Sequence, residues 1–320
     1  MAPRRSKQAL PTSGLIRRWV IGLNVTVALL LGGWYFTQPD GRRDEVRRLV
    51  GNAFKQDKHV SALDVAWDVW QLYYARSTTG TIATGDKTFV YGGTPILAGL
   101  ATGTPLRVLS NRGYAVGYYE AKANPAWVAY RVPDMPTISA SPKRPDRFEI
   151  DARTASRVSP EDYSGSGYDR GHLAPNFAIA TRFGETAQQE TFLMSNITPQ
   201  LHSLNAGLWK QLEMKIATSY PARYGEVWVF AGPIFGTEPK QLRGGVHVPE
   251  AFFMIIVDEQ DDKLRTLSVI VPQDIPADAQ WSSYLTTVAE VERRSRLDFF
   301  RELDDAAEIQ VEQQRATRMW

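Results

Sequence analysis

The chain has no cysteine and only four histidines among its 320 residues. The lack of cysteine excludes disulfide scaffolds, zinc sites with thiolate ligands and thiol catalysis. The sequence has no HExxH pattern either, so its histidines do not predict a zinc hydrolase. The lack of cysteine does not indicate a cellular compartment, because such a chain is compatible with oxidising and reducing environments alike.

The chain also lacks a strong excess of either charge, since 37 bases face 35 acids. Five of the bases lie in the first eighteen residues, which contain no acid, so the rest of the chain is mildly acidic. A protein that coats nucleic acid by bulk electrostatics needs many cations to neutralise phosphates. Any chemistry on a polyanion must therefore be local in this chain.

Hydrophobic and aromatic residues are plentiful. They make up 43% and 11% of the chain, which is enough for a large core and excludes a disordered protein. A mixed fold of 200 to 250 residues is commonly a single unit. We therefore expect one large domain with appendages.

Residues 19–36 read WVIGLNVTVALLLGGWYF and carry no charge, and a basic leader at residues 1–18 precedes them. Their number is near the lower limit for a helix that crosses about 30 Å of hydrocarbon. Aromatic residues at both ends and the basic leader predict an uncleaved anchor in a lipid bilayer, with a cytoplasmic N-terminus and a periplasmic domain. A cleaved signal peptide is the alternative, but no small-x-small cleavage site follows. A mitochondrial presequence joined to an inner-membrane anchor is a third interpretation, with the domain in the intermembrane space.

The body divides into a helical spacer at residues 37–87 and a region of β-type runs from residue 88 onward. The runs are short and punctuated by glycine and proline, and they lie at residues 89–91, 114–119, 127–132, 227–230, 252–257 and 267–271. Helical spacing appears at residues 206–218 and 284–312. This mixture predicts an α+β fold with a largely antiparallel sheet.

The sequence YDRGHLAPN at residues 168–176 places Asp169, Arg170 and His172 around a glycine. Hydrolysis of a phosphodiester needs a base that deprotonates water and positive charge on the phosphoryl oxygens. Histidine and arginine suit those two tasks near neutral pH. The alternative is a polar turn with an exposed histidine.

A second polar cluster follows at residues 193–213, in the sequence LMSNITPQ and then LNAGLWKQLE. Asn205 stands where a helix should begin, and its amide oxygen suits Mg²⁺. Glu213 lies eight residues on, about 12 Å along an ideal helix, so it cannot share direct ligation with Asn205 there. We expect Asn205 to bind the ion directly and Glu213 to hold its waters. A helix cap and a surface ion pair are the alternatives.

The motifs DRGHLAP, SNITPQ and LNxGxWxxLE, in this order and at these separations, resemble those of the DNA/RNA non-specific endonucleases, the ββα-metal nucleases. The resemblance covers most of residues 90–305. It implies a ββα-metal fold with a central antiparallel sheet flanked by helices. We expect the nuclease domain at residues 88–305 and a C-terminal helical tail at residues 306–320.

The resemblance also implies a role for each site residue. His172 would be the general base and Arg170 a phosphate contact. Asn205 would be the sole direct protein ligand of a hydrated Mg²⁺, with Mn²⁺ as a substitute, and Glu213 would organise that ion's waters.

The family pattern implies further substrate contacts. A second phosphate-binding arginine is expected upstream, where Arg144 and Arg147 are both candidates. Asp169 and Asn196 complete the expected set, with a structural role as the alternative for Asn196.

The sequence thus supports a membrane-anchored, Mg²⁺-dependent endonuclease that hydrolyses DNA and RNA and leaves 5′-phosphates. A homodimer is a further expectation, since related nucleases are often dimers. The alternative from another class is a non-catalytic nucleic-acid binding or assembly module on the same fold.

Overall fold

A computed structural model describes residues 32–37, 43, 47, 89–98, 106–135, 141–260, 263–276 and 278–320. The chain divides into two units, Met1–Arg48 and Leu49–Trp320. In the first unit, residues 32–36 are helical. The predicted leader and most of the predicted anchor and spacer lie outside the described residues. Within the part that is described, no helix has the length and apolar character needed to cross a membrane.

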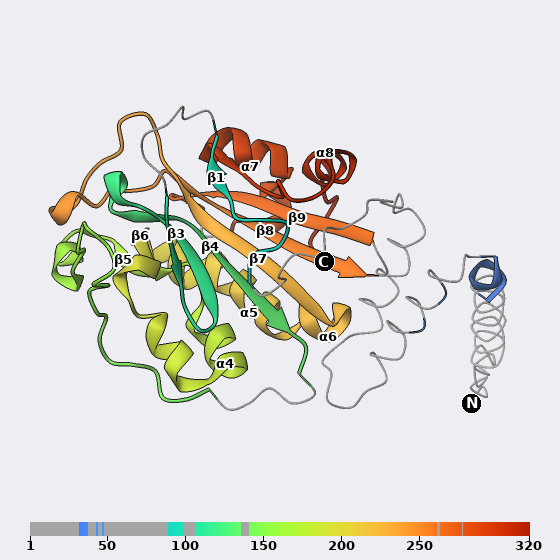
Figure 1. The fold of residues 1–320 in the computed structure, drawn as a ribbon, viewed down its shortest axis with the longest axis horizontal. Coiled ribbons are helices and arrows are strands. Elements are labelled where there is room, and N and C mark those ends of the chain that lie inside the picture. The colour runs from blue at the N-terminus through green and yellow to red at the C-terminus, as the bar shows by residue number, and fades with distance from the viewer. Residues whose placement is uncertain are drawn as a thin grey trace, which may run out of the picture. The chain divides into compact units, whose positions relative to one another are not determined.

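The second unit is built on a seven-stranded sheet in the order β10-β9-β8-β7-β4-β3-β2 (Figure 1). All of its neighbouring strands pair antiparallel. The strands are β2 (Arg107–Ser110), β3 (Tyr114–Tyr119), β4 (Asn124–Pro133), β7 (Glu226–Ile234), β8 (Ala251–Gln260), β9 (Lys263–Pro272) and β10 (Leu285–Thr286). The predicted α+β class with an antiparallel sheet is therefore confirmed.

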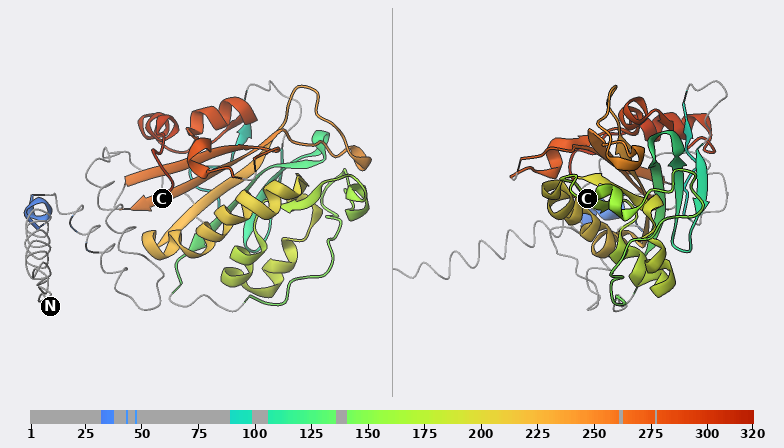
Figure 2. Two further views of the ribbon diagram at one scale, coloured as in Figure 1. Left: turned by 180° about the vertical axis from the view of Figure 1, so that it is seen from behind. Right: turned by 90° about the vertical axis from the view of Figure 1, so that its left-hand side faces the viewer.

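Helices cover both faces of this sheet (Figures 1 and 2). One face carries α7 (Val288–Ser295) and α8 (Asp305–Gln313), and the other carries α4 (Asn176–Glu190), α5 (Lys210–Thr218) and α6 (Tyr220–Tyr224). Because side chains alternate along a strand, Phe230 and Phe253 join the core under α7 and α8. Phe252 points to the opposite face, where its ring centroid lies 5.6 Å from that of Trp209.

A two-stranded antiparallel sheet beside the main one carries the DRGH motif. It consists of β5 (Asp169–His172) and β6 (Ile197–Gln200), with Arg170 opposite Pro199 and His172 opposite Ile197. The short helices η2 (Pro160–Tyr163) and η3 (Met194–Asn196) flank it, and a small core of its own lies beneath, which includes Tyr163, Met194 and Ile197. This core fixes the site residues independently of the large hydrophobic cluster.

Five of the six predicted strands coincide with β3 or lie within β4, β7, β8 and β9. The prediction for residues 89–91 is wrong, because the chain turns there into Gly92 and Gly93, both at positive φ. The predicted helix at residues 206–218 begins slightly earlier, as the π-helical turn η4 (Leu204–Trp209) that leads into α5.

The single helix predicted at residues 284–312 is also wrong, because that segment is interrupted. Arg296 adopts a left-handed conformation that ends α7, and β11 (Leu297–Asp298) then pairs with β1 (Ile96–Leu97). Asp304 caps the start of α8 through its side chain. Val311 of α8 is completely buried in the main core, so the segment predicted as a helical tail contributes to the domain.

Candidate active site

His172, the last residue of β5, lies between two aromatic rings. Its ring centroid is 5.4 Å from that of Phe148 and 4.9 Å from that of Phe192. The buried Nε2 atom has no hydrogen-bond partner among the described residues. Burial, and next the charge of Arg144, lower the pKa of His172 from 6.5 to about 3. The imidazole is therefore neutral around pH 7, and its Nε2 atom is not engaged by another described residue.

Arg170 lies two residues before His172, and side chains two apart on a strand point to the same face. Its Nε and Nη2 atoms donate to the carbonyl oxygen of Pro160 at 3.1 and 2.7 Å. The guanidinium carbon also lies 5.7 Å from the centroid of the Phe148 ring. Phe148 thus contacts both the imidazole and the guanidinium and sets them side by side.

Gly171 separates these two residues and approaches β6 closely. A Cβ atom at this position would meet the side-chain oxygen of Gln200 at 2.0 Å. Because Gln200 is itself completely buried, a side chain at position 171 would have to displace the buried side chain of Gln200. The glycine of the motif is thus required by packing in addition to the flexibility that its sequence suggests.

Asp169 organises the approach to Asn205. One carboxylate oxygen, Oδ2, accepts from Asn205 Nδ2 at 2.9 Å and lies 2.8 Å from His202 Nδ1. The bond engages the nitrogen side of the Asn205 carboxamide, and no described residue donates to its Oδ1. His202 is therefore a further member of this cluster, in addition to the residues that the sequence analysis named. Its spacing of three residues from Asn205, one turn of helix, was the available signal.

Glu213 lies on α5 with a buried carboxyl group, and its Oε1 has no hydrogen-bond partner among the residues described. Burial raises the pKa of Glu213 from 4.5 to about 8, although Trp209, Arg144 and Lys210 act in the opposite direction. The ideal-helix distance predicted between Asn205 and Glu213 does not apply. The intervening segment is a π-helical turn with non-helical backbone angles at Gly207, followed by α5 from Lys210.

The structure distinguishes Arg144 from Arg147, the two candidates for the second phosphate contact. The Arg144 guanidinium carbon lies 5.1 Å from the centroid of the Phe192 ring, and its charge acts on both His172 and Glu213. Both arginines are exposed, but in the described part of the chain Arg147 makes no comparable contact. Arg144 is therefore the arginine that the fold brings to the histidine.

Asn196 is completely buried and serves as a support. Its Oδ1 accepts from Ala174 N at 2.8 Å, while Nδ2 donates to the carbonyl oxygens of Ala174 at 3.0 Å and Thr191 at 2.9 Å. The structural alternative is thus favoured over a substrate contact. These bonds fix the turn that follows His172.

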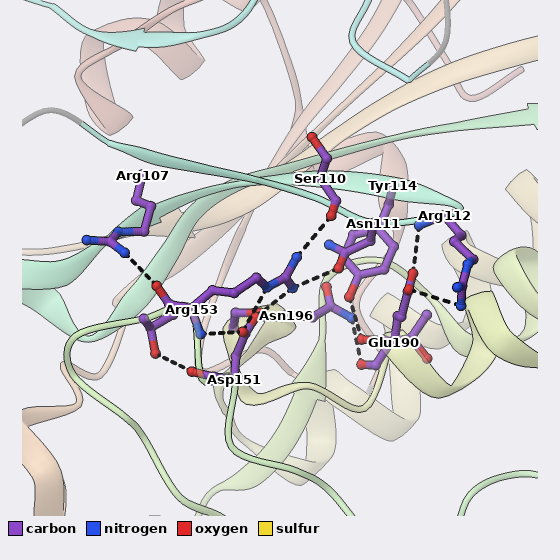
Figure 3. Close-up of polar contacts among 12 residues, drawn as sticks. Arg107, Ser110, Asn111, Arg112, Tyr114, Asp151, Arg153, Glu190 and Asn196 are labelled. Carbon is purple, nitrogen blue, oxygen red and sulfur yellow. Dashed lines mark hydrogen bonds and ion pairs between the residues drawn. The ribbon is translucent and has the colours of Figure 1, made fainter.

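A network of ion pairs and hydrogen bonds around Asp151 and Arg153 lies next to the segment of Ser195 and Asn196 (Figure 3). Asp151 is 3% exposed and accepts from Arg153 Nη2 at 2.7 Å and from Ser195 Oγ at 2.6 Å. Arg153 also donates to the carbonyl oxygen of Ser110 and to Asn111 Oδ1. Ser195 precedes Asn196 in the chain. The network therefore connects the segment that contains Arg144 and Phe148 with β2 and with Asn196, which supports the turn after His172.

The donor set is chemically suited to a hydrated divalent cation. Asn205 Oδ1 is a neutral oxygen that could serve as a ligand, and Glu213 Oε1 is a buried oxygen with no hydrogen-bond partner among the described residues. No group of three or more His, Cys, Asp or Glu residues suited to a metal occurs in the described ranges. A cation at this place would thus be held by few protein atoms and keep waters, as Mg²⁺ commonly does.

The family model of the DNA/RNA non-specific endonucleases matches residues 95–306. The chain belongs to this family. The resemblance drawn from the three motifs is confirmed, and the family's metal dependence agrees with the oxygen donors at Asn205 and Glu213. The mild acidity of the chain is thus compatible with membership of a nuclease family.

Individual relatives show the same relationship. The chain is 32% identical over 222 residues to the mitochondrial nuclease EXOG of Xenopus laevis, covering 63% of this chain and 60% of that protein. It is 32% identical over 211 residues to a nuclease of Nostoc sp., covering 62% of this chain and 75% of the relative. The aligned region spans about three fifths of the length of the EXOG relatives from Xenopus laevis, Mus musculus and Homo sapiens.

A solved structure gives the fold independently. It is the crystal structure of an EndoG/EndoGI complex that addresses the mechanism of EndoG inhibition. The match has a TM-score of 0.55 and 26% sequence identity, and it covers 61% of this chain and 86% of the other. The predicted ββα-like α+β nuclease fold is therefore supported by structure as well as by sequence.

Proposed function

We propose that this chain is a metal-dependent, sugar-non-specific endonuclease that hydrolyses phosphodiester bonds of DNA and RNA. The observation that carries the proposal is the environment of His172. Its ring is neutral, its Nε2 has no partner among the described residues, and two arginines share its aromatic neighbours. Family membership supports the same reaction class.

In the proposed reaction, Nε2 of His172 accepts a proton from the attacking water. The water oxygen forms a bond to phosphorus, and the bond between phosphorus and the 3′-oxygen breaks. The departing 3′-oxygen takes up a proton from a water molecule, so the products are a 5′-phosphate and a 3′-hydroxyl. Arg144 and Arg170 neutralise the phosphoryl oxygens, an interaction that strengthens as negative charge develops. Since every nucleotide sequence offers the same phosphate, these contacts give little base preference.

Asn205 would hold the cation through Oδ1, and Glu213 would hold its waters. Asp169 orients the Asn205 carboxamide by accepting from Nδ2, which leaves the oxygen side for the ion. We assign Mg²⁺, with Mn²⁺ as a substitute, on the basis of this oxygen chemistry. When bound, such a cation stabilises charge on the phosphate and on the departing oxygen.

We also propose that residues 19–36 anchor the protein in a membrane, with the nuclease domain on the far side. The basic leader and the uncharged run support this arrangement. The animal relatives are named as mitochondrial nucleases, which fits the mitochondrial alternative for this anchor. Carbonate extraction and protease protection of the native membranes distinguish an anchored from a released protein. Light scattering of the detergent-solubilised chain tests the proposed homodimer.

The test of the reaction uses the full chain in detergent with plasmid DNA and with a long RNA. Both substrates should be cleaved in Mg²⁺ and neither in EDTA. His172→Gln should reduce cleavage by at least about a thousandfold, the combined loss of base catalysis and placement, with an unchanged thermal midpoint. The matched control Gln189→Ala alters an exposed amide and should retain full activity. Binding without cleavage in Mg²⁺ would instead support the non-catalytic module.

A further inference from the structure

A strip of basic and aromatic residues lies beside β5. It is centred on a hairpin at residues 240–248, in which Val248 N donates to Lys240 O at 2.7 Å and Leu242 N donates to Val246 O at 2.8 Å. We call this surface the basic strip. It consists of Lys122, Tyr168, Phe235, Lys240, Arg243 and His247.

The basic strip is continuous with the catalytic sheet. Lys240 Nζ lies 5.2 Å from the centroid of the Tyr168 ring, and Tyr168 directly precedes Asp169 of β5. Arg243 Nη2 donates to the carbonyl oxygen of Ser164 at 3.1 Å, which fixes the tip of the hairpin to the segment before β5.

The other end of the basic strip reaches the short helix η1 (Glu120–Lys122). His247 N donates to the carbonyl oxygen of Lys122 at 3.1 Å. Lys122 Nζ lies 4.8 Å from the centroid of the Phe235 ring, which is 6.3 Å from that of His247. The hairpin therefore joins two separate segments into one surface that leads away from Asp169 and Arg170.

The cations of the strip differ from the many arginines of the domain that are paired with carboxylates. Among the described residues, ion pairs with carboxylates involve Arg107, Arg112, Arg131, Arg153, Arg265, Arg293 and Arg294. Lys122, Lys240 and Arg243 contact rings and backbone carbonyls instead, and the described part of the chain gives them no carboxylate partner. Asp162 approaches the hairpin at Gly244, but its carboxylate accepts from Ser159 N.

The chemistry of the strip suits the backbone of a polynucleotide. Each lysine ammonium lies over an aromatic ring, which favours a fixed cation and reduces its freedom. The same rings are thereby covered on one face, so they are less suited to stacking of bases. Fixed cations without carboxylate partners bind phosphates of any sequence.

We propose that the basic strip binds the sugar-phosphate backbone of the substrate beyond the phosphate that is cleaved, so that the enzyme prefers long strands to short diesters. This inference rests on the proposed function for the identity of the ligand. It adds accessory phosphate contacts at Lys122 and Lys240, which lie on different segments from the catalytic histidine.

The test measures binding and hydrolysis separately with the full chain in detergent. Binding of a fluorescent 40-nucleotide single strand is followed by anisotropy in EDTA across a range of salt concentrations. Hydrolysis of bis(p-nitrophenyl) phosphate in Mg²⁺ reports the catalytic centre alone. The variant Lys122→Gln/Lys240→Gln is compared with the control Lys215→Gln/Arg301→Gln, which removes the same charge from exposed positions outside the strip.

The strip variant should bind the oligonucleotide about tenfold more weakly, and the slope of log K against log salt should fall by about 1.4, which is about 0.7 for each lost contact. Its hydrolysis of the small diester should stay within about twofold of the wild type. Equal effects of the two double variants, or an unchanged salt slope, would overturn the inference. So would a loss confined to binding of anionic lipid vesicles, because that would identify a membrane contact.

The two proposals can fail independently in this design. Oligonucleotide binding that depends on the strip, without hydrolysis of any diester, would contradict the proposed function and leave the strip intact. If the small diester is hydrolysed but the strip variant binds the oligonucleotide as tightly as the wild type, only the proposed role of the basic strip would be contradicted.

Discussion

Replacement of Asn196 by alanine tests whether this residue is a support or a substrate contact. The side chain is completely buried and makes three hydrogen bonds to the backbone of Ala174 and Thr191. Alanine removes all three at once and leaves one N–H and two carbonyl groups without this partner. Ala174 and Thr191 are completely buried themselves, so water does not reach them directly.

The expected loss follows from these contacts. A buried polar group left unsatisfied costs about 1–3 kcal/mol. The three losses are not additive, because they arise in one small turn that relaxes together. We expect Asn196→Ala to lower the free energy of unfolding by about 3–4 kcal/mol, a large share of the roughly 5–15 kcal/mol typical of a domain. Asn196→Asp should be similarly harmful, because an oxygen would then face two carbonyl oxygens.

Urea unfolding followed by tryptophan fluorescence measures the loss. The control Gln189→Ala, an exposed amide on α4, should change the free energy of unfolding by less than about 0.5 kcal/mol. A decrease of less than about 1 kcal/mol for Asn196→Ala, with a large selective fall in kcat/KM, would refute the reasoning. That result would return Asn196 to the set of substrate contacts.

Two further predictions concern Glu292 and the upstream arginines. Burial first, and then the charges of Glu312 and Asp298, raise the pKa of Glu292 from 4.5 to about 8. The contribution of this residue to stability is therefore fully present below pH 4.5 and is lost as the pH rises towards 8. Glu292→Gln should therefore leave the thermal midpoint unchanged at pH 4.5 and raise the free energy of unfolding at pH 9 by about 1–2 kcal/mol, a value reduced for partial solvation. If the variant differed from the wild type by the same amount at both pH values, the raised pKa would be contradicted. Arg144→Gln should lower kcat/KM on DNA at least about tenfold, as expected for a lost charge-assisted contact, whereas Arg147→Gln should change it less than about threefold, and the reverse order would exclude Arg144 as the phosphate contact.

The strands were the most predictable part of the fold. Residues 227–230, 252–257 and 267–271 are apolar runs in strands that are buried on both faces, so their composition alone indicated the central strands β7, β8 and β9. Helix boundaries were less predictable. The end of α7 depends on a left-handed residue, Arg296, and on the pairing of β11 with β1, a contact between residues two hundred positions apart.

The chemistry of the site was predictable by residue type but not by partner. The DRGH and LNAGLW motifs named His172 and Asn205, and the orientation of Asn205 required the structure, because it depends on Asp169. The choice between Arg144 and Arg147 was open in the sequence for the same reason. Only the position of the Phe192 ring, more than forty residues later in the chain, distinguishes the two arginines.

A chain with a near-neutral charge can act on a polyanion if some of its cations are not paired with carboxylates. In the described domain, several other arginines are neutralised by carboxylates, as Arg153 is by Asp151 and Arg265 by Asp258. Arg144 and Arg170 contact aromatic rings instead, and Arg170 also contacts the carbonyl of Pro160. A carboxylate beside either guanidinium would compete with a phosphate for the same charge. Among the described residues, Arg144 and Arg170 form no ion pair with a carboxylate, and we expect this feature, rather than an excess of bases over the whole surface, to attract the proposed substrate.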